Sequence, residues 1–90
     1  MNAKINIPHI LRQYTNNQGV VEVNGNTVGQ CLNHLIQQLP GIKQEIFDNN
    51  GKLHDYIDVY VNGESSYLEE LAKPVKPGAE LHILFVIDGG

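Results

Sequence analysis

The chain ends in Gly89-Gly90, directly after an apolar run over residues 81–87. Glycine has no Cβ, so two glycines can thread a narrow channel that any other residue would block. A backbone carboxylate on such a thin tail is a chemical handle that a second enzyme could reach. Taken alone, a terminal Gly-Gly is more simply a frayed chain end, because chain ends are commonly disordered. The rest of the chain must decide between these two interpretations.

Few other residues could carry out chemistry. The histidines His9, His34, His54 and His82 are scattered, and Cys31 with His34 is a single pair of soft ligands, which cannot complete a tetrahedral zinc site. Cys31 falls on the apolar stripe of a predicted helix, so we expect a buried, inert thiol. The sequence contains neither G-x-x-x-x-G-K-S/T nor G-x-G-x-x-G. We therefore predict no catalytic residue, no bound cofactor, no metal site and a protein that is not an enzyme by itself.

The composition restricts the remaining classes of function. Ninety residues fit a single domain, residues 1–90, with 88–90 as a flexible tail. The net charge is −4 and the six Lys and Arg residues do not cluster, which argues against nucleic-acid binding. One cysteine favours a reduced compartment, and no segment reaches membrane-spanning length or has the apolar core of a signal peptide. We therefore expect a cytoplasmic protein with no membrane partner.

The first half of the chain predicts two strands and a helix. Residues 3–7 alternate apolar and polar positions, and with a second strand over 20–23 they would form a hairpin with a long polar turn. Thr27 and Gln30 have the spacing of a helical capping box, and Pro40-Gly41 would end the helix. Between them runs an apolar stripe at helical spacing, made of Val28, Cys31, Leu32, Leu35, Ile36 and Leu39.

The second half predicts further strands. A short helical turn over 42–47 precedes a strand over 56–61 whose odd-numbered residues face inward. Asn62-Gly63 is a strong hairpin signal, and Tyr67-Leu68 would be a short returning strand before a tight turn over 68–72. The run over 81–87 is apolar at six of its seven positions, which is typical of a strand that is central in its sheet or covered by a partner. The elements together predict an α+β fold, a mixed sheet of four to five strands packed on one main helix.

A partner-binding patch is predicted beside the tail. If Leu81, Ile83 and Phe85 face the core, the alternate residues of the same strand face outward. The predicted partner-binding residues are Tyr60, His82, Leu84, Val86 and Asp88. The alternative, that loops of the chain itself bury Leu84 and Val86, is equally open at this stage.

Four segments carry a likeness that covers nearly the whole chain. They are Ile5-Asn6-Ile7-Pro8 with Leu11-Arg12, Thr27-Val28-Gly29, Gly51-Lys52-Leu53-His54 running to Val61-Asn62-Gly63, and Lys76-Pro77-Gly78 with Leu81 leading to Asp88-Gly89-Gly90. With these segments the chain resembles the ubiquitin-like β-grasp sulfur carriers of the ThiS/MoaD family. The insert over 42–56 looks closest to the CysO-type carriers of cysteine synthesis. Many members place proline and Val-x before Gly-Gly, whereas this chain has Phe85-Val86-Ile87-Asp88, so we expect its partner to differ from theirs.

The resemblance implies a β-grasp fold and a mechanism. An E1-like (ThiF/MoeB-type) partner would use ATP to adenylate the carboxylate of Gly90, with Gly89 giving reach, and sulfide would convert the adenylate to a thiocarboxylate. A sulfur-accepting synthase would take the sulfur in a cysteine, homocysteine or related pathway, and a metallopeptidase could process the C-terminus. Two functional alternatives stay open: a small (MoaD-like) subunit of molybdopterin synthase, and a ubiquitin-like modifier conjugated through Gly90. A binding module with an accidental tail is the remaining alternative.

Overall fold

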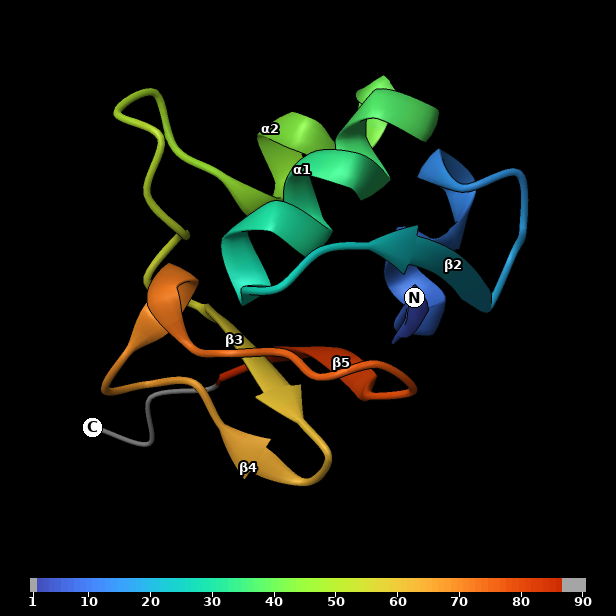
Figure 1. Cartoon of the computed structure of the whole chain (residues 1–90). Helices are drawn as coiled ribbons and strands as arrows, with labels where there is room; N and C mark the ends of the chain where they lie inside the picture. Colours follow the sequence, from blue (N-terminus) through green and yellow to red (C-terminus); the bar gives the residue numbers. More distant parts are fainter. Residues whose placement is uncertain (1, 87–90) are drawn as a thin grey trace.

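The computed structural model describes residues 2–86, so Ile87, Asp88, Gly89 and Gly90, and with them the predicted tail, lie outside the described residues. Within this range the strands lie to one side of the helices (Figure 1). The elements, in which η denotes a 3-10 helix, are β1 (Asn2–Asn6), η1 (His9–Tyr14), β2 (Val20–Asn24), α1 (Val28–Gln38), η2 (Pro40–Ile42), α2 (Lys43–Ile46), β3 (Ile57–Val61), β4 (Glu64–Ser65), η3 (Glu70–Ala72) and β5 (Glu80–Phe85).

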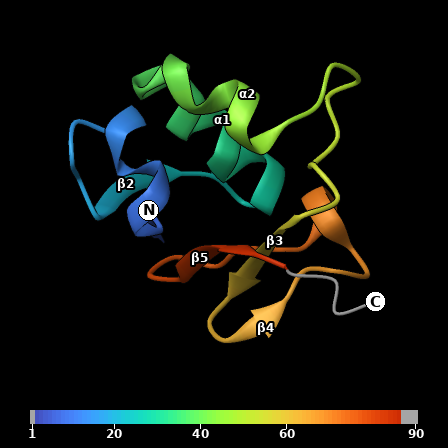
Figure 2. The same cartoon turned by 180° about the vertical axis from the view of Figure 1, so that it is seen from behind.

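The strands form one mixed sheet in the order β2-β1-β5-β3-β4. β1 is antiparallel to β2 and parallel to β5, and β3 is antiparallel to both β5 and β4. The front view (Figure 1) and the view from behind (Figure 2) both place α1 and α2 over one face of this sheet. One main helix on a mixed five-stranded sheet is the ubiquitin-like β-grasp arrangement. The predicted α+β fold is therefore confirmed.

The apolar last strand lies in the middle of the sheet, between β1 and β3, as its composition predicts. Leu81 and Ile83 point into the core, where their side chains are 0% and 1% exposed. Phe85 lies opposite the inner-face residue Ile57, but the expectation that it is buried there is wrong, because it is 40% exposed. The ring lies at the last residue of the strand and stacks on Tyr56 instead of entering the core.

The main helix begins at the predicted cap. The Thr27 hydroxyl accepts a hydrogen bond from the Gln30 amide at 3.1 Å, and the Gln30 side-chain oxygen accepts one from the Asn26 amide at 2.7 Å. The second bond reaches one residue further back than a capping box does, yet it satisfies an exposed amide in the same way. The predicted stripe packs on the sheet, with four residues buried and two partly buried: Val28, Cys31, Leu32, Leu35, Ile36 and Leu39. Among the helices of residues 2–86, none is long and apolar enough to cross a membrane.

The first hairpin forms as predicted, with Ile5 of β1 opposite Val21 of β2. Its long connection contains η1, a 3-10 helix that no periodic pattern in the sequence marks. Leu11 from η1 is buried in the core, and so is Thr15 just after it. The Thr15 hydroxyl donates to the Gln18 carbonyl at 2.8 Å, which closes the polar turn on itself.

The second hairpin returns earlier than predicted. The returning strand β4 is Glu64–Ser65, whereas Tyr67 and Leu68 lie in a turn and are 77% and 89% exposed. Asn62 and Gly63 have φ values of 49° and 86°, the positive values that a two-residue hairpin turn needs. Such a turn pairs Val61 with Glu64 directly, so the strand must begin there. The predicted tight turn over 68–72 contains η3.

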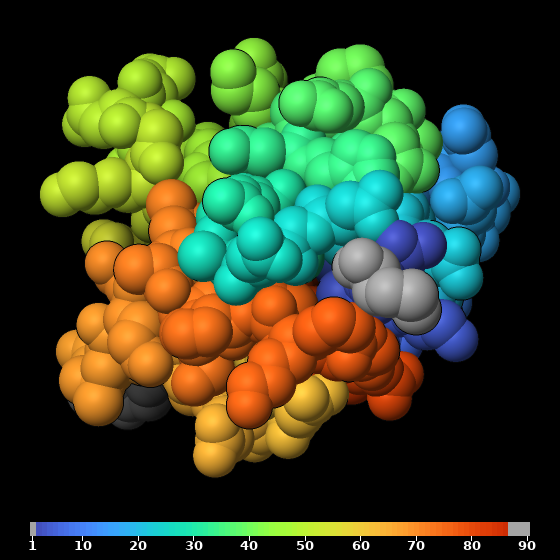
Figure 3. Space-filling view, viewed as in Figure 1, coloured from blue at the N-terminus to red at the C-terminus, as the bar shows by residue number. Residues whose placement is uncertain are grey.

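The segment between η3 and β5 returns along the start of α1. The Val28 amide donates to the Lys73 carbonyl at 3.0 Å, and the Val75 amide donates to the Asn26 carbonyl at 2.8 Å. In the space-filling view this orange segment lies directly against the cyan start of α1 (Figure 3). These bonds attach the chain to the helix side before it turns into the sheet as β5, and so they help to place the strand that leads to the C-terminus.

Candidate functional site

The tail leaves from the end of the central strand. Val86, the last described residue, is held by a hydrogen bond of 2.8 Å from its amide to the Tyr56 carbonyl. β5 pairs with β1 only up to His82, so pairing with β3 and the Val86 hydrogen bond hold the described chain up to this point. The residues predicted to carry the chemistry, Gly89 and Gly90, follow three and four positions later and lie outside the described residues, as does Asp88.

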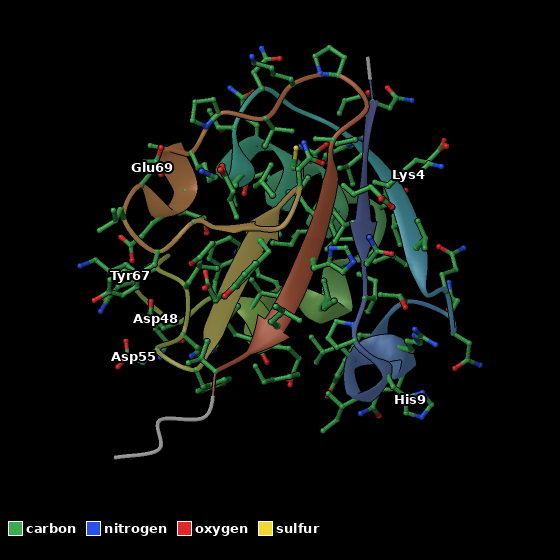
Figure 4. All side chains as sticks on the ribbon, turned by 90° about the horizontal axis from the view of Figure 1, so that it is seen from below. Lys4, His9, Asp48, Asp55, Tyr67 and Glu69 are labelled. Carbon is green, nitrogen blue, oxygen red and sulfur yellow. The ribbon has the colours of Figure 1, made fainter. Side chains whose placement is uncertain are left out.

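One face of the sheet points away from α1, and it carries the predicted patch. Tyr60 on β3 lies opposite His82 on β5, and Asp58 lies opposite Leu84, so these side chains share that face. Leu84 is 39% exposed and Val86 47% exposed, which means that the described loops do not bury them. Figure 4 looks at the molecule from this side, with the strands in front of the helices. The structure thus groups Tyr60, His82, Leu84 and Val86 on one surface, the open face.

The open face continues across β1 into a shallow groove of about 320 Å³. Two of the polar side chains that line it bind backbone carbonyls. The Asn6 amide side chain donates to the Leu81 carbonyl at 3.1 Å, and the Arg12 Nε donates to the Ile7 carbonyl at 3.1 Å. Leu84 contributes to its lining together with Val20 of β2. This groove extends the predicted patch toward the N-terminal strands.

An aromatic stack lies beside the root of the tail, and sequence reasoning missed it. The rings of His54 and Tyr56 are 4.8 Å apart and nearly parallel, and those of Tyr56 and Phe85 are 6.2 Å apart. The Nε2 atom of His54 lies 2.8 Å from the Gln44 carbonyl, an acceptor, so this nitrogen carries the proton. Tyr56 is 48% exposed, which leaves one side of the stack accessible beside Val86. The residues come from a loop and from a strand end, so no spacing in the sequence could join them.

The loop after α2 is organised by Asp48. Its carboxylate accepts hydrogen bonds from the Lys52 amide at 3.0 Å and from the Asn50 amide at 2.8 Å. These two bonds, that of Lys52 first, lower the pKa of Asp48 below its ordinary value of 3.8. The Asp48 turn therefore keeps this loop in a defined shape before the chain reaches His54.

Cys31 and His34 do not form a joint ligand pair. Cys31 is fully buried on α1, and this burial raises the pKa of its thiol above the ordinary value of 9.0. The Nδ1 atom of His34 accepts a hydrogen bond of 2.7 Å from the Asn24 amide at the end of β2. Cys31 therefore packs in the core, and His34 connects α1 to the end of the edge strand β2.

Known proteins share both the sequence and the shape of this chain. The model of the ThiS family matches residues 5–90. Sulfur carrier protein CysO of Mycobacterium tuberculosis is 34% identical over 93 residues, which cover 100% of both chains. Small archaeal modifier protein 1 of Haloferax volcanii is 35% identical over 71 residues, or 78% of each chain.

A solved structure agrees with these likenesses. A chain in the crystal structure of the Amycolatopsis orientalis BexX/CysO complex superimposes with a TM-score of 0.87 and is 36% identical. The match covers 98% of this chain and 99% of that one. The family match extends to Gly90, so it includes the tail as well as the described sheet.

Proposed function

This chain belongs to the ThiS family, and on that premise we propose that it is a sulfur carrier whose C-terminal Gly90 holds the sulfur as a thiocarboxylate. The observation that carries the proposal is the family match through Gly90, joined to full-length likeness with a protein named as a sulfur carrier. The fold adds support, because it directs the end of β5 away from the core beside an open apolar face. The predicted resemblance to this family, and to its CysO-type members, is confirmed.

The proposed reaction begins with activation of the carboxylate. A carboxylate is a poor electrophile, because its charge repels nucleophiles and oxide is a poor leaving group. An E1-like adenylating partner would let an oxygen of the Gly90 carboxylate attack the α-phosphorus of ATP, with pyrophosphate as the leaving group. The product is an acyl-adenylate at Gly90. ATP and its binding groups belong to the partner in this scheme.

Sulfur enters in the second step. Hydrosulfide adds to the carbonyl carbon of the adenylate, and AMP leaves with the electron pair of the broken bond. The resulting thiocarboxylate is nucleophilic and stays covalently attached, so the sulfur is not lost as free sulfide. A sulfur-accepting synthase of a cysteine, homocysteine or related pathway would then take the sulfur, and a metallopeptidase would remove any residues added to Gly90.

The open face would provide the docking surface for the adenylating partner. Leu84 and Val86 are exposed apolar side chains on the strand that leads to the tail, and Tyr60 and His82 flank them. Exposed apolar surface of this kind commonly marks a protein contact. Docking there would bring the tail to the nucleotide without requiring any core residue to touch the partner.

The proposal is tested with the purified chain, ATP, sulfide and each adenylating enzyme encoded in the same genome. We expect intact-protein mass spectra to show a gain equal to the exchange of one oxygen for sulfur, and an alkylating reagent to trap it. Oxidation of Met1 or Cys31 gives nearly the same shift, so fragmentation must place the change at Gly90. A chain that lacks Gly90 is the matched control. A carboxylate that stays unchanged with every candidate enzyme would contradict the proposal.

A second function has a specific observation in its favour. Small archaeal modifier protein 1 matches 78% of this chain, and that protein is named as a modifier. A modifier would also begin with adenylation, and Gly90 would then form an isopeptide bond with a lysine of another protein. Conjugates linked through Gly90 in a lysate, in place of a thiocarboxylate, would favour this function. A stable complex with a larger synthase would instead favour the MoaD-like alternative.

A further inference from the structure

A hollow of about 390 Å³ lies at the root of the tail, on the β3 side of β5. Its apolar wall comes from Leu53, Ile57 and Val86, and Val86 is also the residue from which the tail departs. The exposed side chain of Tyr67 stands at its rim. Figure 4 shows Asp48, Asp55, Tyr67 and Glu69 on this side of the sheet, with Lys4 and His9 on the other. The hollow therefore adjoins the open face at Asp58 and Val86 and extends beyond it toward β4 and η3.

The charged residues that line the hollow are all acidic: Asp55, Asp58 and Glu70. Asp58 is held in place, because its carboxylate accepts a hydrogen bond of 2.6 Å from the Ser65 hydroxyl and one of 2.8 Å from the Val59 amide. Within residues 2–86 the Lys and Arg ion pairs with acidic side chains are those of Lys73 with Glu64 and with Glu69, and none of these residues lines the hollow. In the described chain, therefore, no Lys or Arg forms an ion pair with an acidic residue that lines the hollow.

Two occupants fit this hollow poorly. Within residues 2–86, no group of three His, Cys, Asp or Glu residues is placed to hold a metal ion, so the three carboxylates are too widely spaced for one. The chain's own tail carries Asp88 and the terminal carboxylate, and like charges would repel it from the same lining. A lysine or arginine side chain suits both the apolar wall and the acidic edge of the hollow, because these side chains bury their methylene groups and keep the charged end at a polar edge.

We infer that this hollow receives a lysine or arginine side chain of the adenylating partner, as a contact additional to the open face. The inference rests on the proposed function, because it assigns a second contact to the same partner. Its basis is charge complementarity with Asp55, Asp58 and Glu70, together with the continuity of the hollow with Val86 at the root of the tail. The contact would fix the orientation of the carrier about β5, so that the tail points into the partner's channel.

The test compares two double variants that remove the same amount of charge. Asp55→Asn with Glu70→Gln, the rim variant, removes the two exposed negative charges of the hollow. Within the described chain, neither carboxylate accepts a hydrogen bond that would stabilise the fold. Glu22→Gln with Glu45→Gln is the control, with one change on β2 and one on α2, away from the hollow. The adenylating enzyme that passes the mass-spectrometric test is assayed for kcat and for KM toward the carrier, at low and at high NaCl. Thermal unfolding checks that both variants are folded.

We expect the rim variant to raise KM by about tenfold at low salt, the lower end of electrostatic effects on association, and the control to raise it much less. The kcat should stay within about twofold, because the rim does not touch the reacting carbonyl. The dependence of KM on salt should become weaker in the rim variant, since salt screens such contacts. Equal KM values for the two variants would overturn the inference, and so would a lower KM or a loss confined to kcat. Absence of adenylation of the wild type would instead overturn the proposed function, and the inference with it.

Discussion

The two faces of the sheet are built by alternate residues of the same strands, yet they differ in what covers them. On the inner face, Val59, Leu81 and Ile83 lie under α1 and are at most 1% exposed. On the outer face, Tyr60, His82 and Leu84 occupy the positions between them, and no helix lies over them in the two views of the fold (Figure 1, Figure 2). A single strand, β5, thus contributes to the packed core on one side and to the open face, the proposed docking surface, on the other.

This difference predicts that the stability of the fold and the binding of a partner can be changed separately in this chain. Substitutions on the inner face should lower the free energy of unfolding, because they remove packed apolar contacts. Substitutions on the outer face should leave unfolding nearly unchanged and act on the partner. The following variants test that separation, with the largest expected effect first.

Ile83→Ala should produce the largest loss of stability. Ile83 is 1% exposed under α1, and truncation of a buried isoleucine costs about 2–5 kcal/mol of unfolding free energy. Urea denaturation followed by circular dichroism measures the change. Leu84→Ala, one residue further along β5 on the opposite face, is the matched control and should cost well under that amount. Equal losses for the two variants would end the distinction between the faces.

Leu84→Asp should act on the partner and leave the fold intact. A charge on the open face would have to be desolvated on docking, so kcat/KM for adenylation should fall by about 30-fold or more, the ~2 kcal/mol of an interface hot spot. The free energy of unfolding should fall by no more than about 1 kcal/mol, because the new carboxylate lies opposite Asp58 and like charges facing each other in a sheet are destabilising. Ile10→Asp, at an exposed apolar residue of η1, is the control for an added charge. Equal adenylation rates for Leu84→Asp and the wild type would remove the open face from the mechanism.

Gly25→Ala tests how α1 is placed over the inner face. A Cβ at Gly25 would lie 2.7 Å from the Cys31 amide nitrogen and 2.9 Å from its Sγ, so the start of the helix would have to shift. We expect a loss of about 1–3 kcal/mol, typical of overpacking, with adenylation unchanged under conditions where the chain is folded. Gly41→Ala is the control, because its Cβ would meet only a Tyr14 ring carbon at 3.9 Å. A neutral Gly25→Ala would show that the helix can move without cost.

Asp48→Asn should have the smallest effect and involve neither face. The amides of Lys52 and Asn50 lower the pKa of Asp48 in the folded state below its ordinary 3.8. A carboxyl group whose pKa is lowered by folding stabilises the folded state at pH values above its ordinary pKa. This contribution is lost as the pH falls through the folded-state pKa. The wild type should therefore be slightly more stable than the variant at neutral pH, with the difference vanishing in acid. Urea midpoints at neutral and strongly acidic pH measure this, and a difference that grows in acid would contradict the assignment.

The regular parts of the fold could be predicted because their residues repeat with a clear period. The apolar stripe and the Thr27 cap predict α1, and the apolar character of β5 predicts its central place in the sheet. The returning strand was harder to place, since Tyr67-Leu68 has more strand-like residues than Glu64–Ser65. The two-residue turn at Asn62-Gly63 decides this by geometry, because it pairs the residues next to it.

The candidate site was predictable in part. Alternation along β5 predicts that His82, Leu84 and Val86 share one face, and register with β3 adds Tyr60. Alternation puts Phe85 on the same face as Ile57, but does not predict that its ring is 40% exposed at the strand end and stacks on Tyr56. The aromatic stack and the hollow depend on loops that are distant in sequence, such as His54 and Glu70 against Val86. No local pattern encodes such contacts.

The hydrogen bond from the Val86 amide to the Tyr56 carbonyl limits how far the tail can reach from the domain. It is the last fixed point of the described chain, and four residues follow it up to Gly90. Each residue spans at most about 3.3–3.6 Å, so Gly90 can lie no more than about 13–14 Å from this anchor. Under the proposed function, an enzyme that acts on Gly90 would have to place its reacting atoms within that distance of the end of β5. If several enzymes act on Gly90, the same distance limit would apply to each of them, however different their chemistry.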